Sequence, residues 1–136
     1  MSELLAPAGN YEAFIAAINA GANAVYMGLN SFSARAYANN FAVEDIKSIV
    51  EYAHLRNVKV FVTMNTIIFQ DELPLAYSTI DELAKANIDA IIIQDLALLD
   101  YVAKCYPSIE AHASTQMGID DLEGITSLEK LGVKRV

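Results

Sequence analysis

Short apolar runs alternate along the chain with segments in which apolar residues recur every three or four positions. The runs are rich in β-branched residues and predict strands, whereas the 3.6-residue period of the other segments predicts amphipathic helices. The predicted strands are residues 3–6, 24–28, 59–65, 90–94 and 109–113. The predicted helices begin near residues 10 and 43 and cover residues 71–86, 96–104 and 121–131. This regular alternation is typical of an α/β fold with a parallel sheet.

The predicted helices end in similar short segments that lead into the next strand. Gly21, Asn57, Asn87 and Gly132 follow the last helical turns, and these residue types adopt the left-handed conformation that ends a helix. The units recur every ~20 to 36 residues, as in the repeat of a TIM-type barrel. A doubly wound sheet is the alternative, but residues 7–10 contain one glycine and lack the dinucleotide fingerprint.

A closed barrel of this type has about eight strands, and the chain supplies five and the start of a sixth. We therefore predict an incomplete TIM (β/α)-barrel of five to six βα units. Residues 1–136 would be the N-terminal part of one barrel domain that continues further. An open parallel half-barrel has two unpaired edges, so we expect self-association of the fragment or pairing with further sequence.

The composition of the chain argues against several classes of protein. The chain is 54% hydrophobic and therefore folds, but no apolar run approaches the length of a membrane span, and the first ten residues lack the features of a signal peptide. A net charge of -8 disfavours non-specific binding of nucleic acid by this piece alone. One cysteine fits a reducing cytoplasm, and no spacing of histidines and cysteines predicts a metal site or a cofactor within the chain.

In such barrels the active site lies at the carboxyl ends of the strands and in the loops that follow them. The predicted loop at residues 29–41 is longer than usual, and it contains Arg35 among aromatic residues and Asn40. The pattern fits either a clamp for a phosphate or carboxylate or a loop held together by its own aromatic side chains. We take Arg35 and Asn40 as candidate substrate-binding residues.

The other candidates come from strand alternation, because residues two apart share one face of a strand. Glu110, His112 and Ser114 share a face that we predict to be inside the barrel, since Ala111 and Ala113 suit packing against helices. His112 with Asp95 would form an oriented acid and base, although a buried structural histidine is the alternative. The remaining candidates at strand ends are Asn65, with a catalytic role, and Gln94, Ser114 and Gln116, with roles in substrate binding.

Several phrases at these strand ends closely resemble the N-terminal part of peptidase family U32, the collagenase-like bacterial proteins. They are residues 3–9 (ELLAPAG), 21–28 (GANAVYMG), 32–36 (FSARA), 62–66 (VTMNT), 94–96 (QDL) and 112–117 (HASTQM). The resemblance implies a larger protein whose barrel continues past Val136. Members are classed as proteases, while others serve in hydroxylation of tRNA or ribosomal RNA pyrimidines. The cysteines that hold an iron–sulfur cluster in some members lie beyond the matched region, so a cluster is implied only for the full-length protein.

Three hypotheses about function remain at this point. The first is a hydrolase that uses Asp95 and His112 as acid and base, with Asn65 or Gln116 positioning a carbonyl of a peptide. The second is an RNA-hydroxylation factor in which Arg35 and its loop hold a nucleotide. The third is a catalytically silent half-barrel that dimerises.

Overall fold

Six parallel strands form one sheet whose order follows the chain, β1-β2-β3-β4-β5-β6. The structure is a computed structural model, and it describes residues 2–34 and 40–136. The strands are β1 (Leu5–Pro7), β2 (Ala24–Gly28), β3 (Lys59–Met64), β4 (Ala90–Ile93), β5 (Glu110–Ala113) and β6 (Val133–Arg135). The helices are α1 (Tyr11–Asn19), α2 (Ile46–His54), α3 (Leu73–Lys85), α4 (Leu96–Cys105) and α5 (Leu122–Lys130), with short 3₁₀ helices η1 (Val43–Asp45) and η2 (Thr115–Met117).

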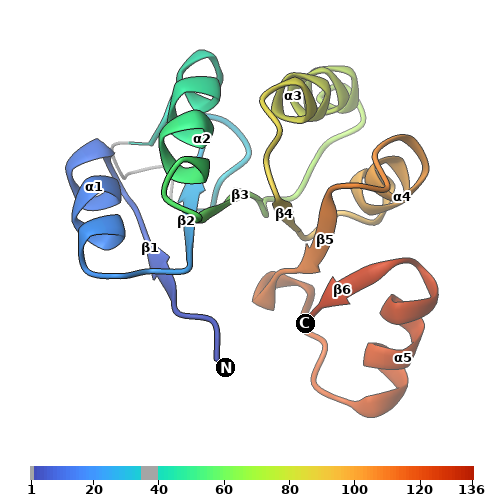
Figure 1. Cartoon of the computed structure of the whole chain (residues 1–136). Helices are drawn as coiled ribbons and strands as arrows, with labels where there is room; N and C mark the ends of the chain where they lie inside the picture. Colours follow the sequence, from blue (N-terminus) through green and yellow to red (C-terminus); the bar gives the residue numbers. More distant parts are fainter. Residues whose placement is uncertain (1, 35–39) are drawn as a thin grey trace.

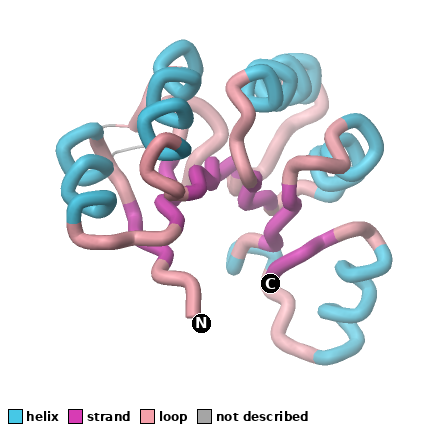
Figure 2. The backbone as a smooth tube through the Cα atoms, in the orientation of Figure 1, coloured by secondary structure: helices cyan, strands magenta, loops and turns pink. Residues whose placement is uncertain are grey.

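The sheet is curved, with the strands along its inner side and the helices around the outside of the arc (Figures 1 and 2). The two ends of the chain lie on the open side of this arc. The fold is therefore the α/β, incomplete barrel that the sequence predicts, and the doubly wound alternative is wrong because the helices all lie on one side of the sheet.

Predicted and observed boundaries differ by up to two residues for most helices and strands. β1 begins at Leu5 rather than at residue 3, and α3 begins at Leu73 rather than at residue 71. The first turn predicted for the second helix is the 3₁₀ helix η1. The predicted left-handed residues after the helices are confirmed, because Gly21, Asn57, Asn87 and Gly132 all have positive φ.

Strand alternation divides the buried side chains into two layers. The larger layer lies between sheet and helices and includes Val60, Val62 and Ile91 of the central strands. A smaller inner cluster contains the buried Ala24, Phe61 and Ala90. Leu5, Tyr26 and Ile92 pack against this inner cluster, which fills the concave side of the sheet. This inner cluster gives the concave side an apolar floor beside His112, whose ring packs on Phe61, as expected for a filled barrel interior.

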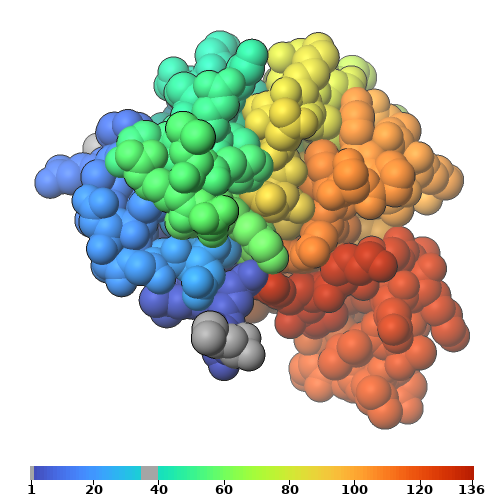
Figure 3. All heavy atoms as spheres, in the orientation of Figure 1, coloured from blue at the N-terminus to red at the C-terminus, as the bar shows by residue number. Residues whose placement is uncertain are grey.

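An ion-pair network around Glu3, which precedes β1, links the two edges of the sheet. Glu3 accepts hydrogen bonds from Arg135 Nη1 at 2.9 Å and from Lys59 Nζ at 3.1 Å. Partial burial would raise the pKa of Glu3, but the hydrogen bonds from Arg135 and Lys59 outweigh that effect and lower it. In the space-filling view, the first and last segments approach each other while α5 projects from the body (Figure 3). Within the described residues, no helix is both long and apolar enough to cross a membrane.

Candidate functional site

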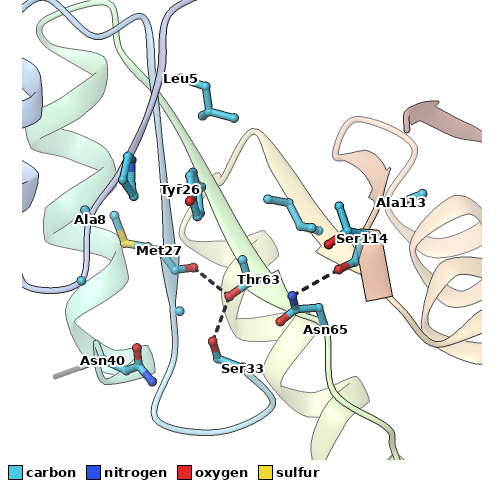
Figure 4. Close-up of a pocket in the computed structure, with 15 residues that line it drawn as sticks. Leu5, Ala8, Tyr26, Met27, Ser33, Asn40, Thr63, Asn65, Ala113 and Ser114 are labelled. Carbon is cyan, nitrogen blue, oxygen red and sulfur yellow. Dashed lines mark hydrogen bonds between the residues drawn. The ribbon is translucent and has the colours of Figure 1, made fainter. Parts of the chain in front are cut away.

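A pocket of about 340 Å³ lies at the carboxyl ends of β1, β2, β3 and β5 (Figure 4). Leu5, Tyr26 and Ile92 of the inner cluster form part of its apolar wall. The polar side chains that line it are amides and hydroxyls, namely Ser33, Asn40, Thr63, Asn65, Ser114 and Thr115, together with the Tyr26 phenol. The lining contains no carboxylate, imidazole, ammonium or guanidinium group from the described residues.

Gly28 allows the loop after β2 to fold back over the strand end. Phe41 N donates to Gly28 O and Asn30 N donates to Phe41 O, both at 3.0 Å. A Cβ atom at Gly28 would overlap Ser33 Oγ and lie 3.0 Å from Asn40 Oδ1. The missing side chain therefore makes room for two polar groups of the pocket.

Hydrogen bonds connect this loop to β3. The Thr63 hydroxyl donates to Met27 O at 3.3 Å, and its oxygen lies 3.1 Å from Ser33 Oγ. These two hydroxyls fix one side of the pocket floor.

Asn65 joins the loops after β2, β3 and β5. Its Oδ1 accepts from the Ala34 backbone N–H at 3.1 Å, and its Nδ2 donates to Ser114 Oγ at 3.2 Å. Ser114 Oγ also accepts from Gln116 N at 3.2 Å and caps η2. The strand-end residues Asn65 and Ser114, which the sequence proposes as site residues, are thus brought together (Figure 4).

Asp95 and His112 do not form the pair that the sequence suggested. Asp95 is the N-cap of α4, and its Oδ1 accepts from Ala97 N at 2.8 Å and Leu98 N at 3.2 Å. β4 ends at Ile93, so Asp95 already belongs to the helix start, where unpaired backbone N–H groups need an acceptor.

His112 is 3% exposed on the inner face of β5. Its Nε2 lies 2.8 Å from Glu110 Oε2, and its ring packs edge-on against Phe61 with 4.9 Å between centroids. Burial lowers the pKa of His112, and the hydrogen bond with Glu110 offsets this only in part. His112 therefore fits the alternative of a satisfied core histidine, held neutral by its surroundings.

The remaining candidates have different surroundings. Asn40 lines the pocket, and Gln116 contributes its backbone N–H while its side chain is exposed. Gln94 is half-buried between β4 and α4 and is not part of the pocket lining. Arg35 lies outside the described residues.

Sequence reasoning missed Ser33 and the role of Gly28 as parts of the site. The signal for Gly28 is a glycine at the last position of a predicted strand, just before a long loop. No sequence pattern marks Ser33 as a site residue, because the position of its hydroxyl depends on how the loop after β2 folds back over the strand end.

The described residues do not fit a metal or iron–sulfur centre. They contain no group of three or more His, Cys, Asp or Glu side chains placed to hold a metal ion. Cys105 is an exposed, free thiol near the end of α4. A cluster would therefore need ligands from outside residues 2–34 and 40–136.

The comparisons with known proteins agree on one family. Residues 9–136 match the model of peptidase family U32. A collagenase of Porphyromonas gingivalis is 41% identical over 124 residues, which are 90% of this chain and 30% of that protein. A 23S rRNA 5-hydroxycytidine synthase of Escherichia coli is 40% identical and the tRNA hydroxylation protein P of Helicobacter pylori 39% identical. Each alignment covers 98% of this chain, and 20% and 32% of the relatives. The chain thus spans less than a third of these proteins.

Solved structures agree on the fold. The U32 peptidase Mk0906 superposes with a TM-score of 0.76 at 18% identity, covering 98% of this chain and 56% of that one. A glycerol uptake operon antiterminator-related protein of Thermotoga maritima gives a TM-score of 0.59 at 17% identity, covering all of this chain and 70% of that one.

Proposed function

Because the chain belongs to peptidase family U32, we propose that it forms the substrate-binding half of a U32 barrel in a protein that hydroxylates pyrimidines in RNA. In this proposal the strand-end pocket holds the base, and Asn65 and Ser114 orient it. The observation that carries the proposal is the neutral polar lining of the pocket, made of amides and hydroxyls on an apolar floor.

The chemistry of this lining suits an unstacked pyrimidine. Such a base presents carbonyl and ring-nitrogen groups at its edge and apolar faces, so hydrogen-bonding groups beside apolar walls match it. A pocket of about 340 Å³ has room for a single ring and its sugar. The relatives named for 23S rRNA and tRNA hydroxylation match nearly the whole chain, which supports the same substrate class.

In this proposal the present chain binds the RNA base. Binding of the RNA backbone and of any cluster is assigned to other parts of the full-length protein. The net charge of -8 gives little attraction for phosphates, so a basic surface from the rest of the protein would hold the RNA backbone. An iron–sulfur cluster would likewise be held by residues beyond those described. We place the protein in the cytoplasm, where its RNA substrates are made.

Peptide hydrolysis is the second candidate, favoured by the collagenase of Porphyromonas gingivalis at 41% identity. The pocket's amides and hydroxyls also match a peptide bond, with Asn65 or Gln116 positioning the carbonyl. In this candidate Asp95 and His112 act as acid and base. It requires both side chains to leave the partners they have in this structure, the α4 backbone and Glu110.

Mass spectrometry of nucleosides distinguishes the two candidates. RNA is isolated from cells with and without the full-length gene, grown with and without oxygen, and the full-length protein is incubated with gelatin in parallel. Loss of a hydroxylated pyrimidine in the deletion strain is the expected result. An unchanged nucleoside profile together with gelatin cleavage would replace the proposal with the hydrolase.

A further inference from the structure

The orientation of the Asn65 amide is fixed by its neighbours. The Ala34 backbone N–H is a donor only, and it lies 3.1 Å from Asn65 Oδ1. The oxygen must face this donor, so the amide nitrogen faces Ser114 Oγ at 3.2 Å and donates to it. The opposite placement of oxygen and nitrogen would set two donors against each other.

Ser114 Oγ also receives the Gln116 backbone N–H at 3.2 Å, and this group again is a donor only. A serine hydroxyl accepts about two hydrogen bonds and donates one. Both acceptor positions of Ser114 are therefore filled, and its hydrogen has no acceptor among the described residues. Ser114 is 6% exposed and lines the pocket, so we infer that this hydrogen is available to a group bound there.

We propose that Ser114 donates its hydroxyl hydrogen to a carbonyl oxygen of the substrate and so selects an acceptor at that position. This inference rests on the proposed function, and it names the group of the pyrimidine that is bound. Uracil has carbonyl oxygens at positions 2 and 4, and cytosine has one at position 2. An amino group placed opposite Ser114 would meet a second donor, and a desolvated donor without an acceptor is costly.

Because the Asn65 amide donates to Ser114 Oγ, it leaves the Ser114 hydroxyl hydrogen available to the substrate. In Asn65→Asp, a carboxylate oxygen replaces the amide nitrogen and accepts the Ser114 hydrogen. The hydroxyl then has no hydrogen for the substrate, although Ser114 is intact. Asn65→Asp and Ser114→Ala should therefore weaken binding of the same ligand group, and the double variant should lose little more than either single variant.

Thio-substituted nucleosides test the inference directly. Binding of uridine and cytidine to the full-length protein is measured by calorimetry. The nucleoside that binds more tightly is then compared with its analogues, 2-thiouridine and 4-thiouridine or 2-thiocytidine, in which sulfur, a weak acceptor, replaces a carbonyl oxygen. For the wild type we expect one analogue to bind about three- to tenfold more weakly than its parent. In Ser114→Ala and in Asn65→Asp this difference between analogue and parent should vanish.

Ser127→Ala is the matched control, because the Ser127 hydroxyl donates to Glu123 O on the exposed surface of α5. It should retain the wild-type difference. If a parent nucleoside binds but sulfur substitution has no effect, or has the same effect in Ser114→Ala, the inference is wrong and the proposed function stands. If neither uridine nor cytidine binds the wild type, the proposed function fails and the inference fails with it.

Discussion

Gly28 is the residue on which the shape of the pocket depends most closely. It pairs with Thr63 at the end of the sheet and leaves the space that Ser33 and Asn40 occupy. Because Ser33 is linked to Thr63, and Ala34 to Asn65, the effect of this one position extends to both polar sides of the pocket. A glycine here is needed for close approach rather than for a left-handed turn.

We predict that Gly28→Ala moves Ser33 and Asn40 out of their places. The overlap should cost about 1 to 3 kcal/mol of folding free energy and weaken nucleoside binding. Gly9→Ala is the control, because no atom lies within 4 Å of a Cβ at Gly9, which also lines the pocket. Urea unfolding and calorimetry measure the two effects. Equal binding by the two variants would contradict this account of Gly28.

His112 gives a prediction about pH. Its pKa is lowered in the folded protein, so between that value and the ordinary value of 6.5 the unfolded chain binds a proton that the folded chain does not. The contribution of neutral His112 to stability is therefore complete above pH ~6.5 and is lost as the pH falls through the lowered pKa.

The expected result is a fall in the free energy of unfolding between pH 7.5 and 5.5 that is smaller in His112→Phe than in the wild type. Urea unfolding followed by circular dichroism at each pH gives the comparison. Parallel curves for the two chains would show that His112 does not contribute.

At the scale of elements, alternation and caps explain what the sequence could predict. The apolar runs specify the strands because both faces are covered, by helices outside and by the inner cluster inside. The glycine and asparagine residues that follow the last helical turns specify where the helices end. The meeting of Asn65 with Ser114 follows from their strand-end positions. The pairing of Asp95 with His112 could not be tested from sequence, because a carboxylate after a strand serves equally as a helix cap.

Asp95 therefore gives a prediction for α4. Asp95→Ala should reduce stability by about 1 kcal/mol through loss of the cap, whereas Asp95→Asn should keep it, since asparagine caps as well as aspartate. We expect RNA hydroxylation by the full-length protein to be unchanged in Asp95→Asn. Thermal unfolding and nucleoside analysis check the two parts. A stable Asp95→Asn protein without activity would restore Asp95 as a catalytic acid or base.

For the whole molecule, the open arc leaves β1 and β6 each with one strand partner in the described residues. Glu3, just before β1, and Arg135, the last residue of β6, join the two edges through their side chains. The pocket is lined by residues from β1 to β5 and the loops after them. Further strands would complete both the sheet and the pocket.

We predict that residues 1–136 expressed alone self-associate, because the unpaired strand edges offer backbone groups to another chain. Light scattering during size exclusion over a range of concentrations measures the mass. A monomer at every concentration would show that the edges are protected by the fold itself.

The central claim is that the strand-end pocket binds the RNA base to be hydroxylated, and complementation in cells tests it most directly. A deletion strain receives the full-length gene as wild type, Asn65→Ala or Ser127→Ala, with protein levels compared by immunoblot, and its RNA nucleosides are analysed by mass spectrometry. The account predicts that wild type and Ser127→Ala restore a hydroxylated pyrimidine and that Asn65→Ala does not. Full restoration by Asn65→Ala at equal protein level, or no change on deletion, would contradict it.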